Sequence, residues 1–86
     1  MIIVRKPTKD EVELALSWQE WSKEISEFDW SYDEQETCYI LKGYAIVTSE
    51  NGQTVNFTAG DWVVFPAGLN CRWIIKETIN KKYKFG

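Results

Sequence analysis

Few side chains in this sequence can do chemistry, and they fall into two groups that lie far apart along the chain. Glu36 and Cys38 stand two residues apart, as do Cys71 and Trp73. Residues two apart in a β-strand project to the same face, so each pair shares a face if its segment is a strand. A carboxyl group can act as a general acid or base, and a thiol can act as a nucleophile or metal ligand once it ionises.

The lack of histidine narrows that chemistry, because histidine is the commonest general base and metal ligand. Glu36 then has two readings: a ligand contact or acid/base group, or a buried carboxylate held by hydrogen bonds to structural partners. Cys71 can be a nucleophile or a thiolate ligand, but no activating cation is evident, since Arg72 has the opposite strand parity. Cys38 fits the description of a small buried apolar residue.

Length and charge exclude several classes of protein. A chain of 86 residues predicts one domain, over residues 1–86, with a small core that the five Trp, four Tyr and four Phe must fill. The net charge is −3, and the densest basic cluster is only Lys81, Lys82 and Lys84, so nucleic-acid binding is not expected. No apolar run is long enough for a signal peptide or a membrane span, which predicts a cytoplasmic protein.

The pattern of apolar residues predicts a chain made almost entirely of strands. Thr8 and Glu11 have the spacing of a capping box and predict a short helix that follows them. Period-two alternation then predicts about eight strands, at residues 21–25, 28–32, 37–42, 44–50, 53–58, 62–65, 71–76 and 78–85. Short strands at such close spacing are typical of a sandwich or barrel.

Glycine-containing turns separate these strands. A turn is expected at residues 42–43, and the pair Asn51-Gly52 predicts a hairpin with a type I′ turn, in which both residues have positive φ. Gly60 and Asp61 predict another turn, which Asp61 can hold through a hydrogen bond to the backbone. The apolar parity changes between Ile25 and Phe28, which predicts a bulge or bend there.

Two motifs carry a resemblance to a known family. Gly60 is followed after five residues by Pro66-Ala67-Gly68, and Glu36 is followed after six residues by Gly43. These spacings resemble the second and the first conserved motifs of the cupins. The resemblance implies an all-β jelly-roll barrel, here with a short N-terminal helix.

The wider pattern resembles a narrower group of small single-domain cupins, related in sequence to the cupin domains of (S)-ureidoglycine aminohydrolase. The residues that carry this likeness are Trp21, Phe28-Asp29-Trp30, Glu36-Thr37-Cys38-Tyr39, Gly60-Asp61, Phe65-Pro66, Trp73 and Lys82-Tyr83. Most members of that group have no defined activity, so the likeness implies the fold more strongly than a reaction.

The resemblance implies where the site lies. Glu36 and Cys71 stand at two of the usual cupin ligand positions, so both should face the barrel interior as the candidate catalytic residues. The expected ligand-binding walls are Trp30, Tyr32, Cys38, Phe65 and Trp73. The usual histidines are missing, so no bound metal or other cofactor is expected.

Two functions are compatible with this pattern. The first is a cupin that binds a small polar or nitrogenous molecule in the barrel, with Glu36 as acid/base or ligand contact. The second is a non-catalytic binding or assembly module whose barrel is plugged by aromatic side chains. A homodimer is expected in either case, because small cores gain from a partner subunit and residues 44–48 are apolar on both faces.

Overall fold

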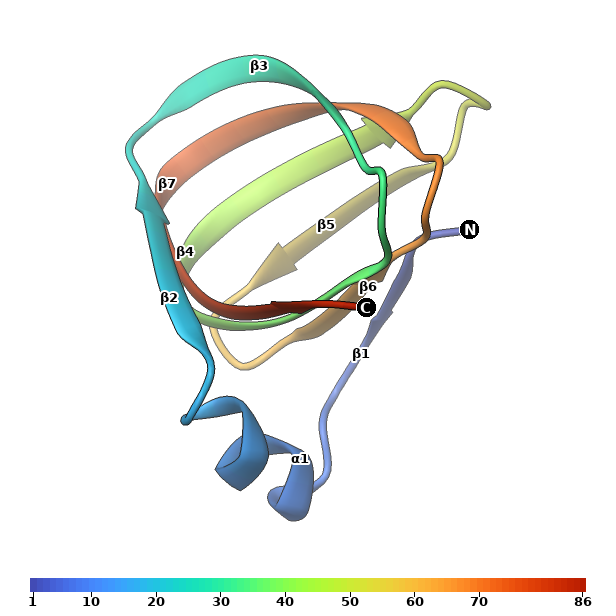
Figure 1. The fold of residues 1–86 in the computed structure, drawn as a ribbon. Helices are drawn as coiled ribbons and strands as arrows, with labels where there is room; N and C mark the ends of the chain where they lie inside the picture. The colour runs from blue at the N-terminus through green and yellow to red at the C-terminus, as the bar shows by residue number, and fades with distance from the viewer.

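Seven strands and one short helix make up the protein in this computed structural model, which describes residues 1–86 (Figure 1). The elements in chain order are β1 (Ile3–Arg5), α1 (Lys9–Ala15), β2 (Gln19–Lys23), β3 (Ser26–Ser31), β4 (Glu36–Ser49), β5 (Thr54–Thr58), β6 (Trp62–Phe65) and β7 (Asn70–Phe85). α1 has seven residues, and no helix here is long and apolar enough to cross a membrane.

The two long strands, β4 and β7, organise the sheet by pairing with each other along most of their length. The first part of β4 also pairs with β6, and its second part pairs with β5. In the same way, the first part of β7 pairs with β3 and its second part with β2. Both long strands therefore run through two layers, and the sheet curls into the antiparallel barrel visible in Figure 1.

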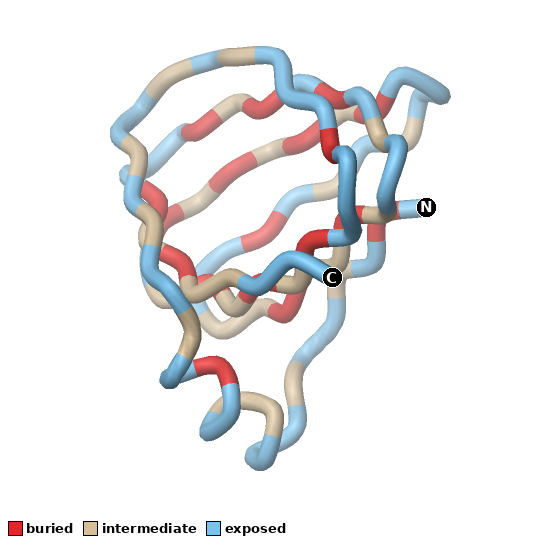
Figure 2. Tube along the Cα trace, viewed as in Figure 1, coloured by how far each residue is buried: buried red, intermediate tan, exposed pale blue.

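Alternating side chains fill the barrel, as expected for strands that bury one face. Buried and partly exposed residues alternate along β4 and over much of β7 (Figure 2). Thirteen buried residues form one core cluster, drawn mainly from β4, β5, β6 and β7, which includes Ile40, Val47, Phe57, Phe65 and Trp73. The predicted barrel of β-strands with a short N-terminal helix is confirmed.

The structure has seven strands where eight were expected, because two expected breaks are bends within longer strands and β1 was not predicted. β4 passes through residues 42–43 without reversing, and its register against β7 shifts there. Gly43 has φ of 101°, and a Cβ at this position would lie 2.2 Å from the Thr78 carbonyl oxygen. Glycine therefore permits a bulge that bends the strand close to its neighbour. β7 likewise continues through residue 77.

The hairpin around Asn51 and Gly52 is present, but the type I′ turn was wrong. Only Gly52 has positive φ, at 94°, whereas a type I′ turn needs positive φ at both central residues. The chain reverses instead through a longer loop between β4 and β5, closed by a hydrogen bond from Ser49 N–H to the Gln53 carbonyl. The second glycine turn is confirmed: Gly60 has φ of 92°, and the Asp61 carboxylate accepts from Thr58 N–H.

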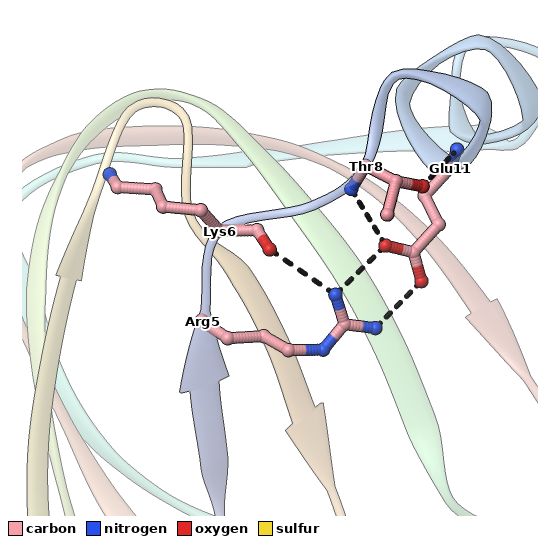
Figure 3. Close-up of polar contacts among 4 residues, drawn as sticks. All are labelled: Arg5, Lys6, Thr8 and Glu11. Carbon is pink, nitrogen blue, oxygen red and sulfur yellow. Dashed lines mark hydrogen bonds and ion pairs between the residues drawn. The ribbon is translucent and has the colours of Figure 1, made fainter.

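The predicted capping box begins α1 (Figure 3). Thr8 Oγ1 accepts from Glu11 N–H, and the Glu11 carboxylate accepts from Thr8 N–H. The same carboxylate receives two hydrogen bonds from the Arg5 guanidinium, at 2.6 and 2.8 Å (Figure 3). These bonds, first of all those from Arg5, lower the pKa of Glu11 to about 2.

The parity change between Ile25 and Phe28 marks a true interruption. β2 ends at Lys23 and β3 begins at Ser26, and both pair with successive parts of β7. Ile25 is 67% exposed at this corner. The corner redirects the chain so that side chains of β2 and β3 converge on the same open end of the barrel.

Candidate functional site

A groove of about 560 Å³ opens at the end of the barrel formed by β2, β3 and the curved strand β7. Its lining residues are Trp21, Lys23, Phe28, Asp29, Trp30, Tyr32, Glu36, Trp73, Lys81, Tyr83 and Phe85. The volume lies within the range usual for small-molecule sites, about 300–1,000 Å³. Mostly aromatic walls with a few polar groups are also typical of such sites.

The deepest polar feature of the groove is an ion pair between Glu36 and Lys81. Lys81 Nζ donates to Glu36 Oε2 at 2.9 Å, and both residues are almost fully buried, at 4% and 3% exposure. Tyr32 O–H donates to the other carboxylate oxygen, Oε1, also at 2.9 Å. Each oxygen of the buried carboxylate thus has a donor, as a charge in a poorly hydrated place requires.

Aromatic rings surround the ammonium group of this pair. Lys81 Nζ lies 4.7 Å from the ring centroid of Trp21, 4.9 Å from that of Trp73 and 5.9 Å from that of Tyr83. Such distances allow cation–π attraction, which is stronger where water is excluded. The protein therefore supplies its own cation to the aromatic interior of the groove.

Tyr32 is fixed in place from several directions. Its N–H donates to the Leu69 carbonyl, its carbonyl accepts from Gly68 N–H, and its ring stacks on Phe65 at 5.0 Å between centroids. Burial, together with the nearby Glu36 carboxylate, raises the pKa of the Tyr32 hydroxyl above its ordinary value. Tyr32 therefore stays protonated and keeps donating to Glu36.

Two more charged residues stand at the rim of the groove: Asp29, which forms an ion pair, and Lys23, which does not. Arg72 pairs with Asp29 at 3.0 Å, and also with Glu27 at 3.2 Å. Lys23 forms no ion pair, and its ammonium lies 5.1 Å from the ring centroid of Phe28. The Arg72 guanidinium is thus shared between Asp29 and Glu27, whereas Lys23 has no carboxylate partner.

The predicted inward-facing residues occupy two different places. Glu36, Tyr32, Trp73 and Trp30 line the groove, with Trp30 half exposed at 49%. Cys38, Cys71 and Phe65 also face the interior, but they belong to the core and do not line the groove. Phe65 packs behind the lining, against Tyr32 and Trp73.

Both thiols are buried and donate hydrogen bonds to backbone carbonyl groups. Cys71 Sγ donates to the Trp30 carbonyl at 3.5 Å, and Cys38 Sγ donates to the Val63 carbonyl at 3.6 Å. Burial, with a smaller contribution from the Glu36 charge, raises the pKa of Cys71 to about 11. Burial likewise raises that of Cys38 to about 12. Both groups are therefore held as thiols near neutral pH, and a catalytic role for Cys71 stays a prediction that this arrangement does not favour.

Lys81 was not predicted as a site residue, although the alternation of side chains along β7 places it on the interior face. Lys81 lies two residues from both Ile79 and Tyr83 on β7, so it faces the same side of the strand as they do. In the sequence it stands beside Lys82 and close to Lys84, as part of a basic cluster near the C-terminus. Lys82 points the other way and pairs with Glu20 at 3.2 Å.

The donor set around Glu36 does not fit a metal ion. No group of three or more His, Cys, Asp or Glu side chains lies close enough together to hold one. The two oxygens of Glu36 instead accept hydrogen bonds from Lys81 and Tyr32. The ammonium of Lys81 supplies the positive charge beside this carboxylate.

Fold, motifs and groove define this protein as a small cupin. The family of EutQ-like cupin domains matches residues 12–83, so the chain belongs to that family. It is similar over its whole length to a DUF861 family protein from Thermotoga maritima, whose crystal structure has a TM-score of 0.96. The two are 43% identical, and the match covers 100% of each chain. No curated protein matches this sequence.

More distant solved structures share the fold alone. The EutQ protein of Clostridium difficile has a TM-score of 0.70 at 18% identity, covering 77% of this chain and 52% of that one. A DUF1255 protein of unknown function from Acidithiobacillus ferrooxidans also scores 0.70, at 23% identity, covering 73% of this chain and 60% of that one. This chain thus spans only part of those two proteins.

Proposed function

We propose that the groove binds a small, planar, polar molecule that carries a carbonyl or amide group and an anionic group. Glu36 and Lys81 contact the carbonyl or amide end, and Lys23 attracts the anionic end at the rim. Glu36 serves as the acid/base group if the bound molecule reacts. The single observation that carries this proposal is a nearly buried ammonium that lines an open groove with one hydrogen bond made.

The donors of Lys81 support the choice of a ligand with an oxygen acceptor. An ammonium group has three N–H donors, and Lys81 uses one of them on Glu36. The aromatic rings around Nζ compensate its charge but offer no oxygen acceptor. A carbonyl oxygen placed beside Nζ would therefore gain a charge-assisted hydrogen bond that the protein alone leaves unmade.

The charges of the groove argue against a cationic ligand. Aromatic cages often bind cations, but this cage already holds the ammonium of Lys81. The unpaired Lys23 adds a second positive charge at the rim, whereas Asp29 shares the Arg72 guanidinium with Glu27. An anionic end of a ligand can pair with Lys23 at the rim, whereas a cation placed in the aromatic cage is repelled by Lys81.

The aromatic walls favour a planar ligand. Trp30 is half exposed at the mouth, and its ring meets those of Phe28 and Tyr32 edge-on, at 6.5 and 6.4 Å between centroids. A flat group that stacks on an exposed indole gains roughly 0.5–1.5 kcal/mol beyond the area that it buries. The sequence resemblance to the cupin domains of (S)-ureidoglycine aminohydrolase supports a nitrogenous group, such as an amide or a ureido group.

The alternative is a module without a ligand, in which the barrel serves only as a scaffold. Its supporting observation is the close packing of Phe57, Phe65 and Trp73, whose centroids lie 5.4–6.1 Å apart in the core. That packing fills the centre of the barrel, but the groove beside it reaches Glu36 and Lys81. We therefore favour ligand binding.

Calorimetric titration with 4-carbamoylbenzoate tests the proposal, because this planar molecule has an amide at one end and a carboxylate at the other. Saturable binding is expected, and it should weaken in Trp30→Ala and in Lys23→Gln, two partly exposed rim positions. Leu14→Ala, on the exposed side of α1, is the matched control and should bind as the wild type does. Lack of binding, or equal binding in all variants, contradicts the proposal.

A further inference from the structure

We propose that Lys81 is a nucleophile that forms a reversible imine with a carbonyl compound in the groove. The inference rests on the proposed function in one respect, namely that a carbonyl group enters the groove and reaches Nζ. The geometry points to this chemistry because an amine, a carboxylate and a phenol are joined in one short chain of hydrogen bonds. That chain runs from Lys81 Nζ through Glu36 to Tyr32 O–H, with both links 2.9 Å long.

Activation of the amine needs a nearby group that takes its proton. Glu36 Oε2 already accepts an N–H of Lys81, so the proton moves along an existing hydrogen bond. The transfer leaves a neutral amine, whose lone pair can attack a carbonyl carbon, beside a protonated carboxyl group. Tyr32 keeps the carboxyl group oriented during this transfer.

The covalent step balances within the site. The nitrogen lone pair of Lys81 forms a bond to the carbonyl carbon, and the π electrons of the C=O bond move to its oxygen. That oxygen takes the proton released by the amine. A second proton, carried by Glu36, then allows the oxygen to leave as water while nitrogen and carbon form a double bond. Overall, one ammonium and one carbonyl compound give one iminium ion and one water molecule, with no change in charge or oxidation state.

The surroundings of Lys81 distinguish it from the other lysines. Trp21, Trp73 and Tyr83 enclose its Nζ and can equally stabilise the positive charge of an iminium ion. Lys82, the next residue, lies outside the groove and pairs with the half-exposed Glu20. Lys82 therefore provides a matched comparison within the same strand.

Reductive trapping tests the inference directly. The protein is incubated with 4-carboxybenzaldehyde and sodium cyanoborohydride, and the modified lysines are located by peptide mass spectrometry. An adduct adds the mass of the probe minus one oxygen atom. We expect Lys81 to be modified roughly tenfold faster than Lys82, a rate ratio that corresponds to about 1.4 kcal/mol in the barrier. Excess 4-carbamoylbenzoate, which cannot form an imine in this way, should protect Lys81.

Variants separate nucleophilicity from simple exposure. Lys81→Arg keeps a positive charge without the amine and should lose the main adduct, whereas Lys82→Arg should keep it. Glu36→Gln should slow modification of Lys81 because it removes the proton acceptor. Site mapping in the wild type needs no variant, so the test survives if Lys81→Arg fails to fold.

The outcomes distinguish this inference from the proposed function. If 4-carbamoylbenzoate binds but the aldehyde modifies surface lysines as fast as Lys81, the imine inference is overturned and ligand binding stands. If Lys81 is trapped selectively while the amide fails to bind, the imine inference stands and binding of amides is rejected. If neither occurs, both are rejected.

Discussion

Lys81 Nζ on β7 lies 2.9 Å from Glu36 Oε2 on β4, and the two residues are among the most buried polar groups of the protein. Their ion pair joins the two long strands that run through both layers of the barrel. The pair also lines the groove, so the same contact belongs to the core and to the candidate site. Buried ion pairs contribute little net stability, yet breaking one leaves an unpaired charge that is costly.

The free energy of unfolding should therefore respond non-additively to changes in this pair. Glu36→Gln keeps an acceptor for Tyr32 but removes the charge opposite Lys81, and Lys81→Met removes the ammonium. Each single variant should lose about 3–5 kcal/mol, and the double variant should lose clearly less than the sum. Urea denaturation measures all three. Lys82→Met, which breaks the pair with the half-exposed Glu20 outside the groove, should cost clearly less than either of these single variants. Additive losses in the double variant would contradict a direct coupling of Glu36 to Lys81.

Both thiols should resist alkylation in the native protein. Burial raises the pKa of Cys71 to about 11 and that of Cys38 to about 12, from an ordinary 9.0, so neither is a thiolate near neutral pH. Iodoacetamide at pH 8 should label both thiols only after unfolding, as followed by mass spectrometry. Rapid labelling of native Cys71 would instead restore it as a candidate nucleophile.

The same shifts predict how stability depends on alkaline pH. A raised pKa in the folded state favours the protonated thiol, so this contribution to stability is fully present below pH 9.0, the ordinary pKa. It is lost progressively as the pH rises from there through about 11 to 12. The urea midpoint should fall over this window, and Cys71→Ala should reduce the pH-dependent part of the fall. An identical pH dependence in the variant would exclude Cys71 as its source.

Much of the fold can be predicted from short-range patterns in the sequence. The capping box of Thr8 and Glu11 and the turn at Gly60 are short-range features, and the structure has both. The bend at Gly43 could not be told from a turn, because both need a glycine with positive φ. What decides between them is the approach of β7 at Thr78, a contact made 35 positions later in the chain.

The candidate site was predicted less completely than the fold. Strand parity placed Glu36 and Trp73 correctly in the interior, and the cupin motif drew attention to them. Strand parity also puts Lys81 on the interior face, although a lysine is almost never fully buried unless it is paired. The partner that makes its burial possible, Glu36, comes from a distant strand, and only the register of β4 against β7 brings them together.

Metal content is a further prediction that the site geometry supports. Because Lys81 and Tyr32 already donate to both oxygens of Glu36, we expect no stoichiometric transition metal in the purified protein. EDTA should leave the melting temperature unchanged, since no metal-linked stabilisation is removed. Elemental analysis that finds about one metal per chain, with loss of that metal in Glu36→Ala, would overturn this expectation.

Self-association remains a prediction that solution measurements must test. Ile46 on β4 and Ile74 on β7 are register partners on the outward face of the sheet, and both are only partly buried. A homodimer that covers this face should sediment at twice the mass of the chain, and Ile46→Glu should convert it to a monomer. Glu24→Lys, which changes charge at an exposed position outside this face, is the control. A wild-type monomer at high protein concentration would rule the homodimer out.

The indole N–H signals in a two-dimensional NMR titration with 4-carbamoylbenzoate test ligand binding in the groove most directly. Five tryptophans give five such signals, and three of them, Trp21, Trp30 and Trp73, line the groove. Trp18 and Trp62 pack against each other elsewhere, with ring centroids 5.5 Å apart, and serve as internal controls. Binding in the groove predicts saturable shifts of the first three signals and unchanged positions for the other two. Five unchanged signals, or shifts confined to Trp18 and Trp62, would contradict a ligand site at Glu36 and Lys81.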